Sequence, residues 1–108
     1  MSDAVRNLYE VVLQRKKEKQ EGSYTCYLFE QGRDKILKKV GEEASEVIIA
    51  AKNGDNAYTQ EEICDLLYHL MVLMADSDIP LEKIEEILEE RACKIGNLKQ
   101  FKKTDRNT

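Results

Sequence analysis

The sequence has no tryptophan, and only 6% of its 108 residues are aromatic. Charged residues, by contrast, make up 35% of the chain. This balance suits a helical protein with a thin aliphatic core better than a β-sandwich. A chain of this length forms one domain and buries only about two thirds of its unfolded surface. Because a second copy would supply further apolar contact, we expect a homodimer.

Sequence features of secreted, membrane and nucleic-acid-binding proteins are also missing. Cys26, Cys64 and Cys93 are odd in number and have no CxxC spacing, which indicates reduced thiols rather than disulfides or a zinc site. No secretory signal is visible, and no apolar run approaches the roughly 18 residues that a membrane span needs. The net charge of −4 argues against a general nucleic-acid surface. We expect a cytoplasmic protein that binds neither membranes nor nucleic acid.

Apolar residues recur at helical spacing along most of the chain. Caps and glycines predict helices over 4–20, 34–52 and 60–76, a short helical segment over 25–32, and a last helix from Pro80 to Gly96-Asn97. Asp3 and Asp78 are the expected N-caps of the first and last helices. We therefore expect an all-α fold of four to five helices in an antiparallel bundle. The domain should cover residues 1–101, followed by a polar tail over 102–108.

Two of these helices are expected to bury wide apolar stripes. In the helix over 34–52 the stripe consists of Ile36, Leu37, Val40, Ala44, Val47, Ile48 and Ala51. In the helix over 60–76 it consists of Ile63, Leu66, Leu67, Leu70, Leu73 and Met74, with Glu62, Asp65, His69 and Val72 in a second stripe beside it.

Acidic residues stand one turn apart within both apolar patterns. The first helix carries Glu42, Glu43 and Glu46, and the second carries Glu62 and Asp65. Residues three or four apart share one face of a helix, so an antiparallel pairing can bring these acids together. Close carboxylates need a compensating cation, and Mg²⁺ prefers oxygen ligands and often bridges carboxylates to phosphates. The pattern predicts a magnesium site at which water attacks a phosphoric anhydride.

Some of these residues have a purely structural interpretation as well. Thr59 and Glu62 match a capping box. Capping and metal binding are equally good explanations of Glu62. Asp65 lies well inside its helix and has no such explanation. His69, one turn later, is more often a hydrogen-bonded packing residue than a catalyst.

Lysines precede the first group of acids. Lys38 and Lys39 stand four residues before Glu42 and Glu43, which is the less favourable order for ion pairs on a helix. Contact with phosphate beside a metal would explain them better. No glycine-rich phosphate loop is present, so a metal and lysines would have to bind the anhydride.

These motifs resemble those of the all-α, MazG-like nucleotide pyrophosphohydrolase superfamily, and within it phosphoribosyl-ATP pyrophosphohydrolase. The resemblance covers roughly residues 22–91. It is carried by the segments Ser23-Tyr24-Thr25, Leu28-Phe29, KVGEEA (39–44) with Glu46-Val47, and Glu62 with DLLYHL (65–70). It implies Mg²⁺-dependent hydrolysis of phosphoribosyl-ATP to phosphoribosyl-AMP and pyrophosphate in histidine biosynthesis, by a helical dimer.

The resemblance also implies roles for individual residues. By position, the metal ligands would be Glu43, Glu46, Glu62 and Asp65. Glu42 would be a further catalytic acid that positions water or a ligand. Phosphate contacts would come from Lys38, Lys39 and Lys52. The length leaves no room for the phosphoribosyl-AMP cyclohydrolase to which this activity is often fused, so we expect a stand-alone enzyme.

Two other functions stay open from the sequence. A house-cleaning NTP pyrophosphatase of the same superfamily would use the same ligands with a different base pocket. A non-catalytic helical dimerisation module would carry the acids as solvated surface. The sequence does not identify the residues that recognise the base. Tyr24 and Tyr27 are candidates, but they are also explained as aromatic residues that cover the core.

Overall fold

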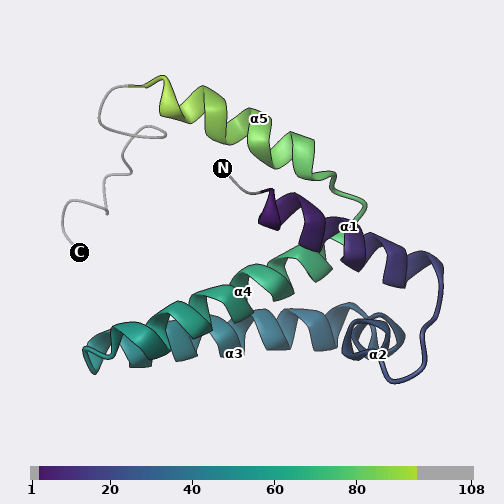
Figure 1. Cartoon of the computed structure of the whole chain (residues 1–108), viewed down its shortest axis with the longest axis horizontal. Coiled ribbons are helices and arrows are strands. Elements are labelled where there is room, and N and C mark those ends of the chain that lie inside the picture. Colours follow the sequence, from purple (N-terminus) through teal and green to yellow (C-terminus); the bar gives the residue numbers. More distant parts are fainter. Residues whose placement is uncertain (1–2, 95–108) are drawn as a thin grey trace.

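The computed structural model describes residues 3–94, which form five α-helices and no strand (Figure 1). The all-α prediction is therefore confirmed. The helices are α1 (Ala4–Lys17), α2 (Tyr24–Gln31), α3 (Arg33–Lys52), α4 (Asn56–Asp76) and α5 (Leu81–Ala92). The predicted end of the last helix at Gly96-Asn97 and the tail over 102–108 lie outside the described residues. None of the helices within 3–94 is long and apolar enough to cross a membrane.

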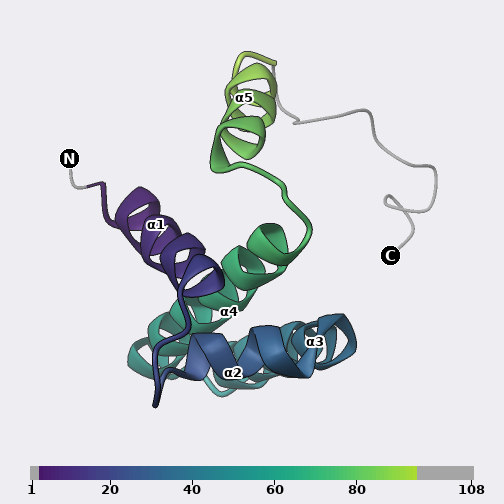
Figure 2. The same cartoon turned by 90° about the vertical axis from the view of Figure 1, so that its right-hand side faces the viewer.

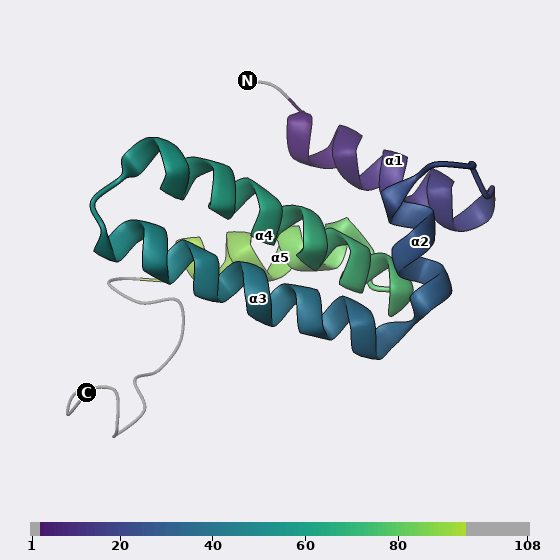
Figure 3. The same cartoon turned by 90° about the horizontal axis from the view of Figure 1, so that it is seen from below.

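Helices α3 and α4 form an antiparallel hairpin that is the longest part of the molecule (Figure 3). Gly54 makes the turn with a φ of 72°, a left-handed conformation that glycine adopts without strain. The carboxylate of Asp55 then accepts a hydrogen bond from the backbone N–H of Tyr58 and caps α4. The hairpin thus ends in a compact turn with its own polar cap.

This cap corrects the predicted start of α4. The helix begins at Asn56, so Thr59 lies inside its first turn and donates from Oγ1 to the carbonyl of Asp55. Glu62 is therefore not the third residue of the helix, and the predicted capping box is wrong. Asp55, and not Thr59, is the N-cap because it directly follows Gly54, the glycine at which the chain reverses direction.

The core lies at the other end of the hairpin. There α1 crosses α4, and α2 lies across the start of α3 (Figure 2). The buried cluster draws on every helix: Tyr9 and Val12, Leu28, Ile36, Met71, Val72 and Ala75, and Leu81. Ser23 begins α2 by accepting a hydrogen bond from the N–H of Cys26. Gly32, with a φ of 94°, turns the chain from α2 into α3.

Helix α5 extends away from the hairpin, as Figure 2 shows. It is anchored at its start by buried Leu81 and by ion pairs of Arg6 with Glu82 and Glu85. Asp78 does not cap it, because its φ of 58° turns the chain before Pro80, and its carboxylate binds Lys16 at 2.9 Å. The predicted aspartate cap is therefore wrong.

Burial within α3 and α4 also differs from prediction. Of the expected core residues, Ile48 is 63% exposed, Ile63 42% and Leu67 45%. In the second, acid-bearing stripe, Glu62, His69 and Val72 are buried, whereas Asp65 is exposed. Within one chain, α4 therefore turns its polar stripe toward α3 and α2 and leaves aliphatic side chains uncovered.

Candidate active site

Three of the predicted acids meet between α3 and α4. Carboxylate oxygens of Glu43, Glu62 and Asp65 lie within 4.8 Å of one another. In the part of the chain that the structure describes, no other three acidic, histidine or cysteine side chains come so close. Glu62 is buried, the Glu43 side chain is 13% exposed and Asp65 is exposed. This acid triad is therefore rooted between the helices and opens to solvent at Asp65.

The triad gathers negative charge at a free-energy cost. Burial, hydrogen bonding with the Glu62 carboxyl, and the charges of Asp65 and Glu62 raise the pKa of Glu43, while Lys39 opposes this change. Hydrogen bonding with Glu62 and its charge likewise raise the pKa of Tyr58. Both pKa shifts indicate that the cations of the described chain do not fully neutralise the negative charge of these carboxylates.

Among residues 3–94, Lys39 is the cation paired with this group. Its Nζ lies 3.6 Å from Glu43 and 3.9 Å from Glu42, and its side chain is only 24% exposed. One ammonium group thus sits at the edge of the triad. Glu42 is exposed and stands outside the triad on the same side of α3 as Lys39.

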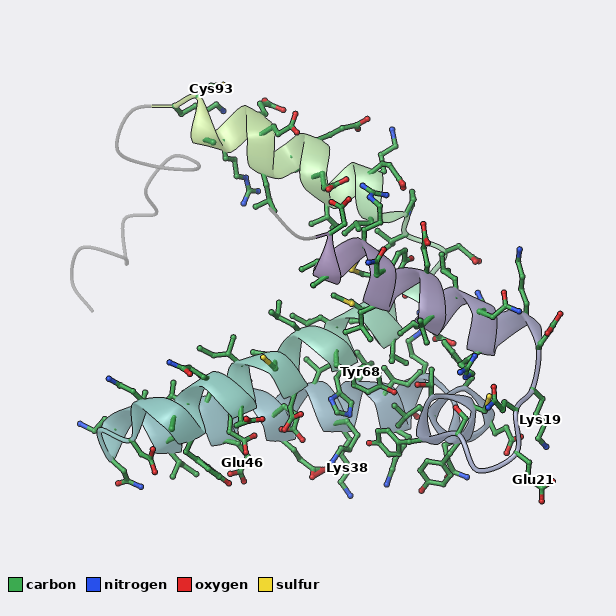
Figure 4. The ribbon with its side chains drawn as sticks, viewed as in Figure 1. Lys19, Glu21, Lys38, Glu46, Tyr68 and Cys93 are labelled. Atoms are coloured by element: carbon green, nitrogen blue, oxygen red, sulfur yellow. The ribbon has the colours of Figure 1, made fainter. Side chains whose placement is uncertain are left out.

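The other predicted residues lie farther from the triad's centre. Glu46 is half-buried and not part of the close group, although its charge contributes to the raised pKa of Tyr58. Lys38 and Glu46 project from the same edge of the hairpin in Figure 4. Lys52 is exposed in the last turn of α3, toward the Gly54 turn. Glu46 borders the site, whereas Lys52 belongs to the end of the hairpin.

Two aromatic contacts at the site were not predicted. Tyr58 lies outside the predicted helix over 60–76, but α4 begins earlier and places it one helical turn before Glu62. Recognising Asp55 as the cap would have revealed this spacing. The second contact joins Tyr24 of α2 to His69 of α4, with 3.1 Å between the hydroxyl and Nε2.

The hydrogen bonds of His69 define its tautomer when the ring is neutral. Its Nδ1 lies 2.7 Å from the carbonyl oxygen of Asp65, which can only accept a hydrogen bond. Nδ1 therefore carries the proton, and Nε2 accepts from the hydroxyl of Tyr24. His69 is buried and hydrogen-bonded through both ring nitrogens, as its interpretation as a packing residue expects.

The chemistry of the donor set fits Mg²⁺. Three carboxylates supply hard oxygen ligands, and Mg²⁺ binds such oxygens while keeping several of its waters. The solvent-facing side at Asp65 leaves space for waters or phosphate oxygens. A divalent cation would also supply the compensation that Lys39 alone does not give.

Comparison with known proteins identifies the family of this chain. Residues 5–92 match the family model described as phosphoribosyl-ATP pyrophosphohydrolase. A protein of Clostridium botulinum named phosphoribosyl-ATP pyrophosphatase is 55% identical over 95% of this chain and 94% of its own length. Proteins of the same name from Listeria innocua and Pelotomaculum thermopropionicum are 58% and 63% identical, over 83% and 68% of this chain and 86% and 74% of theirs. The chain belongs to the phosphoribosyl-ATP pyrophosphohydrolase family.

Proposed function

We propose that this chain hydrolyses phosphoribosyl-ATP to phosphoribosyl-AMP and pyrophosphate in histidine biosynthesis, with Mg²⁺ as its cofactor. The observation that carries the proposal is the acid triad, which two helices assemble beside Lys39. The substrate is inferred from family membership, since the relatives are named phosphoribosyl-ATP pyrophosphatase.

Each residue has a role that its surroundings support. Glu43, Glu62 and Asp65 would hold Mg²⁺, with Glu46 as a further ligand from the bordering turn of α3. The bound ion would neutralise phosphate charge and lower the pKa of water. Lys39 pairs with phosphate oxygens, helped by the exposed Lys38, while Lys52 gives only a peripheral positive charge. Glu42 orients the attacking water from outside the triad.

The reaction breaks the anhydride bond between the α- and β-phosphates. A water oxygen bonds to phosphorus, pyrophosphate leaves, and a carboxylate of the site accepts the proton of the water.

A second copy of the chain is the proposed partner. Large aliphatic side chains on α3 and α4, including Ile48, Ile49, Ile63 and Leu67, are exposed on the helices that build the site. Ile87 and Leu88 are exposed on α5, which extends away from its own hairpin. Apolar area of this kind is normally covered, and a homodimer would cover it with matching aliphatic surface.

The proposed location is the cytoplasm. Its reducing conditions suit the three free cysteines, Cys26, Cys64 and Cys93.

The decisive experiment incubates the purified chain with phosphoribosyl-ATP and Mg²⁺ and measures phosphoribosyl-AMP and pyrophosphate. EDTA controls and a panel of ordinary and modified nucleoside triphosphates run in parallel. We expect chelator-sensitive release from phosphoribosyl-ATP in preference to the panel. Release from another nucleotide alone would overturn the substrate assignment and favour a house-cleaning enzyme. No release by folded protein would favour a non-catalytic module.

A further inference from the structure

Two tyrosines of α2 are exposed although their rings are held in place. Tyr24 is 45% exposed and Tyr27 42%, and their rings stack with centroids 6.0 Å apart. The chain's other tyrosines in the core behave differently. Tyr9 is buried, and the half-buried Tyr68 exchanges a hydrogen bond with Thr25. Tyr24 and Tyr27 thus present aromatic surface that the described chain does not use for its core.

The ring of Tyr24 is fixed from three directions. It stacks on Tyr68 at 6.2 Å and on Tyr27, and it meets the edge of His69 at 5.8 Å. Its hydroxyl donates to Nε2 of His69, whose Nδ1 donates to the backbone of Asp65. An exposed aromatic ring that is already immobilised loses little conformational entropy when a flat ligand stacks on it.

The same contacts place this surface beside the acid triad. One imidazole ring and two hydrogen bonds separate the hydroxyl of Tyr24 from the backbone of Asp65. The charges of Lys39, Glu43 and Glu42 all act on Tyr24. A nucleotide with its phosphates at the triad and Lys39 would therefore have its base within reach of α2.

We propose that Tyr24 and Tyr27 form the surface on which the purine of the nucleotide substrate stacks, and that His69 is the positioning residue that holds Tyr24 there. This inference rests on the proposed function for the identity of the nucleotide. Aromatic rings stack on any base face, so the surface supplies affinity for the base, while the acids and lysines recognise the phosphates.

The first test uses the full chain with Mg²⁺ present in every titration, so that uncompensated carboxylates at the triad do not oppose phosphate binding. Its tyrosine rings carry ¹³C, and NMR follows titrations with AMP and with ribose 5-phosphate, which lacks the base. The signals of Tyr24 and Tyr27 should shift with AMP alone, and that of Tyr9 with neither ligand. Equal shifts with both ligands, or none with AMP, would overturn the proposal.

Variants then separate the ring from its support. Tyr24→Leu and Tyr27→Leu keep apolar bulk but lose the ring, and should bind AMP roughly tenfold more weakly. His69→Leu keeps the ring of Tyr24 but removes the imidazole that its hydroxyl binds. This variant should bind AMP more weakly, while its binding of ribose 5-phosphate should not change. Tyr9→Phe, which alters a buried hydroxyl at Ile79, is the matched control. Unchanged AMP affinity in His69→Leu would remove the positioning role.

Kinetics distinguish failure of this inference from failure of the proposed function. If the chain hydrolyses phosphoribosyl-ATP, Tyr27→Leu should raise KM roughly tenfold with little change in kcat. If Tyr24→Leu and Tyr27→Leu both hydrolyse phosphoribosyl-ATP with an unaltered KM, the stacking surface is overturned and the proposed function stands. Base-selective AMP binding without hydrolysis would support the surface and overturn the function. Thermal unfolding of each variant confirms that it is folded.

Discussion

Arg33, the first residue of α3, donates from Nε to the carboxylate of Asp76, the last residue of α4, at 2.6 Å. A second bond from its guanidinium reaches the carbonyl oxygen of Asp76 at 3.2 Å. These bonds join the open end of the hairpin, opposite the Gly54 turn. The Arg33 side chain is 53% exposed, so solvent limits the strength of the pair.

We expect this pair to contribute about 0.5–1 kcal/mol to the free energy of unfolding, because it is partly exposed but joined by more than one bond. A double-mutant cycle with Arg33→Gln and Asp76→Asn, followed by urea unfolding, measures the coupling. The exposed pair Lys83–Glu86 on α5, 3.4 Å apart, is the control and should couple more weakly. Equal coupling in both cycles would contradict the expectation.

Asp65→Asn should lower turnover of phosphoribosyl-ATP by about two orders of magnitude or more while leaving helicity unchanged. Asp65 is exposed, so the fold does not depend on it, but the amide removes a negative oxygen ligand from the triad. Glu61→Gln changes an exposed acid of the same helix outside the triad and should retain activity. Full activity of Asp65→Asn, measured as pyrophosphate release, would exclude Asp65 as a ligand.

Glu43 should make the stability of the metal-free protein depend on pH. Its pKa is higher in the folded chain than in the unfolded chain, so the folded state binds the proton more tightly. The resulting stabilisation is present below the ordinary carboxyl pKa and is lost as the pH rises through the raised value. In EDTA at neutral pH, Glu43→Gln should therefore be more stable than the parent, by up to about 1 kcal/mol.

Urea unfolding of both proteins across mildly acidic to neutral pH tests this expectation. The gain of Glu43→Gln should grow with pH, and added Mg²⁺ should stabilise the parent more than the variant. Glu61→Gln serves again as the control, since its carboxylate is exposed. A variant that is less stable than the parent at every pH would show that Glu43 stabilises the fold.

Charges placed on the exposed aliphatic surface should dissociate the proposed homodimer. Ile48→Glu or Leu67→Glu would bury a carboxylate in an apolar interface, which costs several kcal/mol without a partner. Sedimentation equilibrium should find the parent dimeric and both variants monomeric. Gln60→Glu, an exposed polar position on α4, should remain dimeric. A monomeric parent would disprove the dimer directly.

Most of the fold was predictable from local sequence signals. Helical spacing located all five helices, and the predicted ranges 25–32 and 34–52 lie within one residue of α2 and α3 at each end. Asp55 was missed because Thr59 with Glu62 also satisfies a capping pattern. The choice between the two caps depends on the geometry of the preceding turn, which residue types alone do not define.

The site was predictable in its acids and less so in its surroundings. Spacing along each helix brought Glu43, Glu62 and Asp65 to one side, and the antiparallel pairing united them. The contact of Tyr24 with His69 joins residues 45 positions apart and depends on how α2 lies across the hairpin. The exposure of Ile63 and Leu67 was also missed, because apolar spacing identifies an apolar helix face without showing what packs against it.

The acid triad imposes a rule on where the chain can change in length. Each residue inserted within α3 after Glu43, or within α4 before Glu62, rotates the rest of that helix by about 100°. One such insertion would turn the acids of one helix away from those of the other. Insertions between α1 and α2 or between α4 and α5 leave the triad's spacing unchanged, since all three of its residues lie between those two segments. Loop grafts and affinity tags therefore belong in those segments, and the stretch from Glu43 to Asp65 must keep its length.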